Sequence, residues 1–117
     1  MREQPQPYEE NRPWGSFRQF THNELTTVKI IGVKKGERNS LQRHKLRNEE
    51  WIIIAGSMEL TLGKQVVIGN VGDRFEIPAG TNHRFKGLGD DNRLLEISRG
   101  HFDENDNERI EDDYGRA

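Results

Sequence analysis

Cysteine is absent from the 117 residues of this chain, which excludes disulfide bonds, thiolate metal ligands and a cysteine nucleophile. No apolar run approaches the roughly 18 residues that a membrane-spanning helix requires. The N-terminal stretch MREQPQPYEE also lacks the apolar segment of a signal peptide. Hydrophobic residues make up only 31% of the chain, less than is usual for globular proteins, so we expect a small core with many turns. These absences predict a cytoplasmic protein that has no membrane partner.

Charge of neither sign dominates. Eighteen basic and 20 acidic side chains give a formal net charge of −2, which offers no reason to expect a nucleic-acid partner. Seven acidic residues lie in residues 100–117 with only two arginines, and the simplest interpretation of this segment is a solvated acidic tail. Three of the four prolines lie in the first thirteen residues. Because proline fixes φ and lacks a backbone donor, residues 1–20 are predicted to form an extended arm.

Residues 26–99 alternate between short strand-like segments and turn residues. No window shows a sustained apolar period of 3.6 residues, so helices are not expected. The predicted strands are Thr27–Lys35, Trp51–Ala55, Met58–Leu62, Gln65–Ile68, Arg74–Ile77, His83–Phe85 and Arg93–Ser98. Many short strands with glycine turns predict an antiparallel barrel or jelly roll, with residues 1–117 as a single domain.

Two stretches of the chain contain side chains that are able to bind a metal. In GERNSLQRHKLRNEEWIIIAG, Gln42 and His44 are two residues apart and share one face of a strand. Glu49 follows at the start of the next apolar run. The second stretch, GDRFEIPAGTNH, ends at His83, which would face the other three if the two strands were neighbours. Two imidazoles, a carboxylate and an amide oxygen would suit one divalent ion, with Zn, Mn, Co, Ni and Fe all compatible.

These two stretches resemble the paired motifs of the cupin superfamily, G-x5-H-x-H-x(3,4)-E-x6-G and G-x5-P-x-G-x2-H-x3-N. The motif spacing is kept, with Gln42 in place of the first histidine and Gly87 in place of the final asparagine. The resemblance implies an all-β cupin fold, the double-stranded β-helix or jelly-roll barrel. The further stretches RPWGSF, SLQRHKLRNEEW, IPAGTNHR and EDDYGR are similar to the C-terminal cupin domain of type II mannose-6-phosphate isomerases, from Arg12 to Arg116.

Similarity to these isomerases implies that mannose 6-phosphate and fructose 6-phosphate are interconverted through an enediol(ate). The implied metal ligands are Gln42, His44, Glu49 and His83. The chain is too short to include the nucleotidyltransferase domain that often precedes this cupin, so guanylyltransfer is not expected of it. Cupins commonly pair through their sheets, and proline-bearing arms would be able to exchange between subunits, so we also expect a homodimer.

The candidates for proton transfer are Lys29, where the family tends to have a lysine, and Glu50. Glu50 is expected to point away from Glu49 because strand neighbours face opposite sides. The candidates for phosphate binding are Arg84, Arg47 and Arg12, because a planar guanidinium suits phosphate geometry.

Two alternatives remain open. The first is a non-catalytic cupin that binds a sugar or sugar phosphate, which is favoured by Glu50 at a position where the family has histidine. The second is another metal-dependent cupin enzyme, such as an oxygenase or epimerase. An oxygenase more often has two histidines and one carboxylate around iron, and Gln42 argues against that arrangement.

Overall fold

The computed structural model describes residues 8–117, which form an all-β structure of eleven strands. Among these residues there is no helix long and apolar enough to cross a membrane. The strands are β1 (Tyr8–Arg12), β2 (Gly15–Gln19), β3 (Thr26–Val33), β4 (Leu41–Arg43), β5 (Arg47–Ala55), β6 (Ser57–Leu62), β7 (Gln65–Asn70), β8 (Arg74–Ile77), β9 (His83–Gly87), β10 (Asn92–Gly100) and β11 (Glu108–Glu111).

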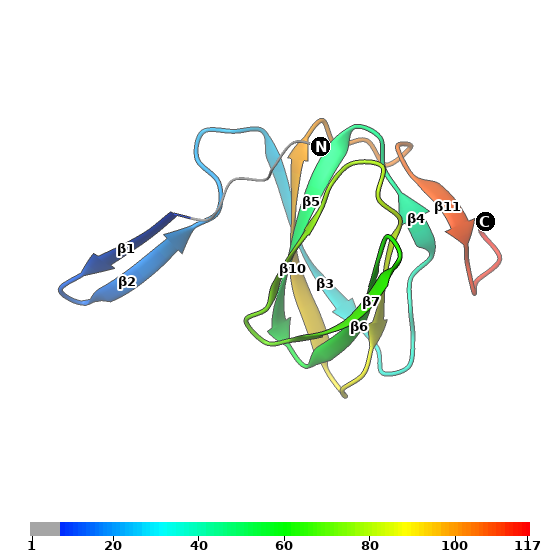
Figure 1. Ribbon diagram of the computed structural model, residues 1–117, viewed down its shortest axis with the longest axis horizontal. Coiled ribbons are helices and arrows are strands. Elements are labelled where there is room, and N and C mark those ends of the chain that lie inside the picture. The colour runs from blue at the N-terminus through cyan, green and yellow to red at the C-terminus, as the bar shows by residue number, and fades with distance from the viewer. Residues whose placement is uncertain (1–7) are drawn as a thin grey trace.

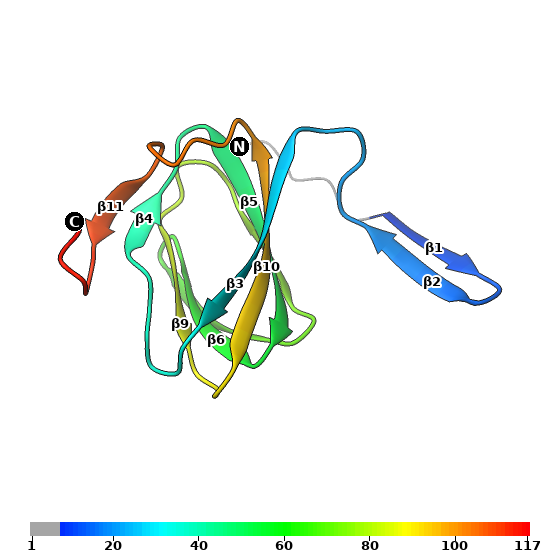
Figure 2. The same ribbon diagram turned by 180° about the vertical axis from the view of Figure 1, so that it is seen from behind.

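Two sheets face each other around a common interior (Figures 1 and 2). One sheet has four strands in the order β3-β10-β5-β8, and the other has five in the order β11-β4-β9-β6-β7. Every neighbouring pair in both sheets is antiparallel. The predicted antiparallel jelly-roll barrel is therefore confirmed, and its topology places β5 beside β10 although they are far apart in the sequence.

All seven predicted strands are present, although their boundaries differ by a few residues. The largest difference is in β5, which begins at Arg47 rather than at Trp51. The four strands that were not predicted are β1, β2, β4 and β11. Gly56, which separates β5 from β6, has φ of +69°, and a Cβ there would lie 2.3 Å from the carbonyl oxygen of Asp91. This motif glycine is therefore required both by its backbone conformation and by the close approach of a neighbouring loop.

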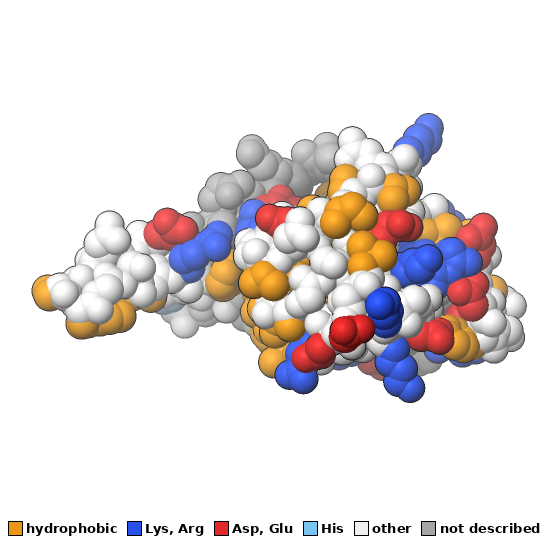
Figure 3. All heavy atoms as spheres, turned by 90° about the horizontal axis from the view of Figure 1, so that it is seen from below, with side chains coloured by type: hydrophobic (Ala, Val, Ile, Leu, Met, Phe, Trp, Pro, Cys, Tyr) orange, Lys and Arg blue, Asp and Glu red, His pale blue; other side chains and the backbone are white. Residues whose placement is uncertain are grey.

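The N-terminal segment is a hairpin rather than an extended arm. Residues 8–12 and 15–19 pair in a separate two-stranded sheet, with Pro13 and Trp14 in the turn. The hairpin projects from the barrel (Figures 1 and 2), and hydrophobic side chains are exposed at its tip (Figure 3), where Trp14 is 75% exposed. Predicted features in residues 1–7 lie outside the described residues.

The acidic tail is ordered against the barrel, although most of its side chains are exposed to solvent as expected. Residues 108–111 form β11, which pairs with β4 at the edge of the five-stranded sheet. The charges explain this packing, because Arg43 on β4 forms an ion pair with Glu108 on β11, with a distance of 2.8 Å. The acidic side chains of this segment serve partly to attach it to basic residues of the barrel.

The barrel interior has an apolar end and a polar end. The buried apolar cluster consists of Trp51, Ile53, Met58, Leu60, Ile77, Phe85 and Leu94. Alternate residues of a strand share a face, so Glu49 on β5 faces the interior with Trp51. By the same alternation, Glu96 and Ser98 on β10 face it with Leu94. Glu49 lies near the N-terminal end of β5, opposite Ser98 near the C-terminal end of β10, and this end is polar. Glu96 lies at the middle of β10, opposite Trp51, where the polar end meets the apolar cluster.

Candidate metal centre

His44, Glu49 and His83 converge at the polar end of the interior, and we refer to these three residues as the candidate metal centre. His44 follows β4, Glu49 lies in β5 and His83 begins β9. One ligand atom from each of the three lies within 4.8 Å of the others, and all three side chains are at most 3% exposed. The structure therefore brings together residues from both sheets that the sequence analysis had grouped by motif spacing alone.

Backbone carbonyls orient both histidines of the centre. His44 Nδ1 lies 2.8 Å from the carbonyl oxygen of Asp106, and His83 Nδ1 lies 2.9 Å from that of Thr81. A carbonyl can only accept, so each Nδ1 carries the proton and each Nε2 presents a lone pair. His44 Nε2 lies 3.3 Å from Glu49 Oε2, and His83 Nε2 lies 3.6 Å from Glu49 Oε1. Burial lowers the pKa of His83, which favours the neutral imidazole that binds metals.

Unsatisfied buried atoms show that these residues fit a divalent cation. Among the described residues, Glu49 Oε1 and His83 Nε2 have no hydrogen-bond partner although both atoms are buried. A buried carboxylate oxygen and a buried imidazole lone pair are costly to leave unpaired. A cation between them would satisfy both, and two nitrogens with one carboxylate form a donor set suited to Zn, Mn, Co, Ni or Fe.

Gln42, the fourth predicted ligand, lies directly opposite His83 in the β4–β9 pair. Residues opposite each other in an antiparallel pair point to the same face, so Gln42 faces the interior with the centre. Its Oε1 accepts a hydrogen bond from Ser40 Oγ, with a distance of 2.8 Å. Gln42 therefore remains a predicted ligand on the correct face, held by a hydroxyl group from the same segment.

Arg47, which was predicted to bind phosphate, contacts the candidate metal centre itself. Its Nε donates to Glu49 Oε2 over 3.1 Å and its Nη2 lies 3.2 Å from His44 Nε2. The side chain is only 6% exposed. The guanidinium thus neutralises one oxygen of the Glu49 carboxylate, while the other oxygen faces His83 without a partner.

The 101–107 loop covers the centre from the outside. The Asp106 carboxylate accepts hydrogen bonds from the backbone N–H groups of Lys45 and Leu46, over 2.9 and 2.8 Å. The Phe102 ring lies 4.3 Å from Lys29 Nζ and 4.2 Å from Arg47 Cζ, so two cations contact one ring. Sequence analysis missed Phe102 and Asp106, because nothing in the motif spacing indicates that the C-terminal segment returns to this end of the barrel.

Lys29 faces the interior from the edge strand β3, opposite Glu96 on β10. Its Nζ forms an ion pair with Glu104 over 3.2 Å, and its side chain is 40% exposed. Lys29 therefore lies at the boundary between the polar interior and the 101–107 loop, where a cation is able to meet an anionic group entering from outside.

Glu96 is a buried carboxylate that sequence analysis did not single out. It is 7% exposed, and burial, followed by the charge of Glu49, raises the pKa of Glu96 to about 7. A usable signal was present: Glu96 falls between Leu94 and Ser98 in the alternation of a predicted strand. A charged residue at an inward position of such a strand is an exception that calls for a functional explanation.

Three predicted site residues do not join the centre. Glu50 lies on the outer face of its sheet, completely buried, and is ion-paired with Arg74 and, over 3.0 Å, with Arg99. Glu50 therefore does not reach the centre, because the strand alternation that points Glu49 inward points Glu50 outward, and its role in proton transfer remains an untested prediction.

Arg84 likewise faces away from its neighbour His83. Its Nε donates to the carbonyl of Asn39 over 3.0 Å, and its Nη1 lies 3.4 Å from Glu111. Arg12 lies in the projecting hairpin, where it forms an ion pair with Glu10 over 3.1 Å. The structure therefore does not bring Arg84 or Arg12 to this centre, and their phosphate-binding roles remain predictions.

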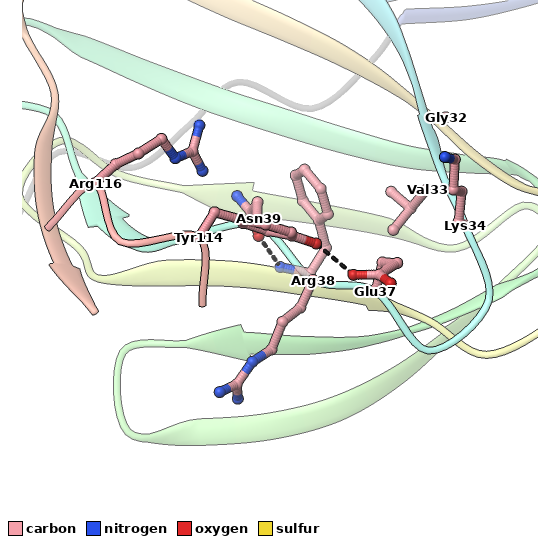
Figure 4. A pocket seen from close by; sticks show the side chains of 9 residues that line it. Gly32, Val33, Lys34, Glu37, Arg38, Asn39, Tyr114 and Arg116 are labelled. Carbon is pink, nitrogen blue, oxygen red and sulfur yellow. Dashed lines mark hydrogen bonds between the residues drawn. The ribbon is translucent and has the colours of Figure 1, made fainter. Parts of the chain in front are cut away.

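A separate cavity of about 440 Å³ lies where the C-terminal residues meet the connection between β3 and β4 (Figure 4). The Tyr114 hydroxyl donates to Glu37 on that connection. Arg38 holds Asp113 in a two-point ion pair, with distances of 2.6 and 2.8 Å. These contacts fasten the EDDYGR segment to the barrel and explain why its acidic and aromatic residues occur together.

The fold and the His–Glu–His centre define the class of this protein as a cupin. Solved structures with the same fold include a dTDP-6-deoxy-D-glucose-3,5-epimerase from Legionella pneumophila, with a TM-score of 0.69 and 15% identity over 89% of this chain and 69% of that one. Another is a sugar phosphate isomerase of the cupin superfamily from Silicibacter pomeroyi, with a TM-score of 0.59 and 21% identity over 65% of this chain and 51% of that one.

Sequence comparison assigns the chain to one family within this class. The model of the family described as "Mannose-6-phosphate isomerase C-terminal" matches residues 2–112, and the chain belongs to this family. The xanthan biosynthesis protein XanB of Xanthomonas campestris pv. campestris is 38% identical over 91% of this chain and 23% of its own length. The mannose-1-phosphate guanylyltransferase ManC of Salmonella typhimurium is 36% identical over 91% and 22%. The chain thus spans less than a quarter of the length of these curated relatives.

Proposed function

We propose that this protein is a metal-dependent sugar-phosphate isomerase that interconverts mannose 6-phosphate and fructose 6-phosphate. The observation that carries the proposal is the candidate metal centre, in which two imidazole lone pairs and a carboxylate converge at the polar end of a barrel. Membership of a family described by mannose-6-phosphate isomerase adds the substrate class. Aldose–ketose isomerisation requires charge stabilisation on the substrate oxygens beside a group that transfers a proton.

His44, Glu49 and His83, with Gln42 beside them, would hold the metal. A divalent metal at this centre supplies positive charge that polarises substrate oxygens and stabilises an enediolate. Lys29 supplies a cation at the outer boundary of the interior, where the 101–107 loop covers the centre. We assign Lys29 to the substrate phosphate or oxygens, because phosphate binding requires cations that are accessible from outside.

Turnover by reconstituted protein tests this proposal. The protein is stripped with chelator and reloaded separately with Zn, Mn, Co, Ni or Fe. Conversion of fructose 6-phosphate into mannose 6-phosphate is then followed by NMR. His44→Ala should abolish both turnover and metal binding, whereas His22→Ala, at an exposed loop position, should change neither. Absence of turnover with every one of these metals would overturn the proposal.

A sugar-phosphate-binding cupin without turnover is the second candidate. The observation that favours it is that Arg47 already bonds to two atoms of the centre. In that case calorimetry would show binding of mannose 6-phosphate or fructose 6-phosphate, with no conversion in the NMR experiment.

We also propose that the protein is a homodimer in which the second copy covers the hairpin. A two-stranded hairpin alone is marginally stable in water, yet β1 and β2 pair only with each other among the described strands. Trp14 on the hairpin is 75% exposed, and Val28 and Ile30 on the edge strand β3 are 56% and 66% exposed. The aromatic tip of one copy and the apolar edge of another are complementary surfaces of the kind that a symmetric dimer buries.

A further inference from the structure

We propose that Glu96 is the residue that carries the proton between C1 and C2 of the sugar phosphate, an assignment that rests on the proposed isomerase function. Glu96 is an inward-facing carboxylate at the middle of β10, next to the polar end of the interior, in the sheet opposite the one that contains β4 and β9. Neither the motif resemblance nor the family description points to it.

The register of the four-stranded sheet places Glu96 close to the candidate metal centre. Glu49 lies directly opposite Ser98, and Glu96 is two residues from Ser98 on the same face. Glu96 and Glu49 are therefore diagonal neighbours, which lie about 7–8 Å apart in an antiparallel pair. Glu96 therefore lies beside the candidate metal centre, where a proton acceptor and a charge-stabilising group would act on the same substrate.

Glu96 also lacks the ion pairs that the other buried carboxylates of this sheet have. Glu49 is paired with Arg47, and Glu50 with Arg99. Among residues 8–117 no ion pair to Glu96 is present, although the charges of Lys29 and Arg47 are close enough to act on it. Lys29, which lies opposite Glu96 in the sheet, instead pairs with Glu104. The one hydrogen bond that Glu96 accepts from a hydroxyl is a long one, 3.5 Å from Ser98 Oγ.

This environment leaves the carboxylate able to gain and lose a proton. Burial, followed by the charge of Glu49, raises the pKa of Glu96 to about 7, while the charges of Lys29 and Arg47 oppose this rise. Lys29 is less suited to this step, because its Nζ is held between the Phe102 ring and the Glu104 carboxylate. Glu50 does not reach the centre from its position on the outer face.

The reaction balances with Glu96 as the only carrier of the carbon-bound proton. In open-chain mannose 6-phosphate, the Glu96 carboxylate takes the proton from C2. The C2–H electron pair forms the C1–C2 double bond, and the C1–O1 π electrons move onto O1. The O2 hydroxyl then gives its proton to O1, C2–O2 becomes a carbonyl, and Glu96 returns its proton to C1. The product is fructose 6-phosphate, and Glu96 ends as it began.

The test compares Glu96→Gln with the wild-type protein, both loaded with the same metal. Glutamine keeps the shape of the side chain and removes its ability to accept the proton. We expect kcat to fall about 100-fold or more with KM little changed, which is the pattern for a lost proton-transfer group. Incorporation of deuterium from D2O at C1 of fructose 6-phosphate, followed by NMR, should fall in parallel. Metal content and melting temperature should remain those of the wild type or higher.

Control variants separate this assignment from the proposed function. Glu59→Gln removes a carboxylate from the outer face of the other sheet and should have no effect. If Glu96→Gln fails to fold, Glu96→Asp, which retains the charge but withdraws it by one carbon, should still lower kcat at least 10-fold. Wild-type turnover that persists within about threefold in Glu96→Gln would overturn the assignment alone. A wild-type protein without turnover or exchange would overturn the isomerase proposal, and the assignment with it.

Discussion

The Nε2 atom of His83 lies 3.6 Å from Oε1 of Glu49, and neither of these buried atoms has another partner among the described residues. Their geometry predicts that a divalent metal stabilises the fold. At a concentration about 100 times the dissociation constant, binding to the folded state alone contributes about 2.7 kcal/mol. Adding metal to stripped protein should therefore raise the melting temperature by several degrees in a thermal scan. Glu49→Gln should lose this rise and Glu59→Gln should keep it; equal rises in both variants would contradict a role for this centre.

Arg47 is expected to matter most when the metal is absent, because it is then the described cation that neutralises buried Glu49. Removing one partner of a buried ion pair typically costs about 3–5 kcal/mol. Arg47→Met should show a loss of this size in urea unfolding with chelator, and most of it should be recovered when metal is added. Arg43→Met, which removes an exposed pair with Glu108, should show little change in either state. A loss that is the same with and without metal would contradict the coupling.

Asp106 attaches the 101–107 loop to residues 45 and 46, next to His44. Backbone hydrogen bonds lower the pKa of Asp106, so its stabilising contribution is present above the ordinary carboxyl range and is lost as the pH falls through the lowered value. Asp106→Ala should release the loop that orients His44 and weaken metal binding about 10-fold, the lower end for residues that support ligands. Calorimetric titration measures this. Asp90→Ala, at a highly exposed position, is the matched control and should bind metal normally.

The raised pKa of Glu96 predicts a specific pH dependence of stability. A carboxyl group whose folded pKa lies above its unfolded value destabilises the folded state as it ionises. The penalty is absent below the ordinary value of 4.5, grows with pH, and is complete above about 7. In the metal-free protein, the free energy of unfolding of Glu96→Gln should therefore rise relative to that of the wild type across this pH range, by up to about 3 kcal/mol. A difference between the two proteins that does not change with pH would show that Glu96 is not perturbed.

The homodimer proposal predicts a solution mass of twice 13.6 kDa. Light scattering coupled to size-exclusion chromatography measures it directly. Replacing the exposed apolar surface on the hairpin and β3 with Trp14→Ser and Ile30→Lys should produce a monomer. Val66→Ser changes a residue that is also exposed, 62%, but lies on the other sheet, and should leave the dimer intact. A wild-type mass of 13.6 kDa at working concentration would contradict the proposal.

The sequence by itself determined the fold class and the members of the candidate metal centre. Glycine-separated strands without helical periodicity are compatible with few architectures, and motif spacing is enough to group His44, Glu49 and His83. The alternation of side chains along a strand also predicted that Glu50 would face away from Glu49. These features are local or periodic, so a single sequence is able to show them.

Only the tertiary structure decided which other residues reach the polar interior. Glu96 is brought beside the centre by the pairing of β10 with β5, and Phe102 and Asp106 by the return of the C-terminal segment over the barrel. Arg84 and Arg47 look equivalent in sequence, yet one faces outward and the other contacts the centre. Such placements depend on long-range strand register and on ion pairs between distant segments, which a linear pattern of residue types does not encode.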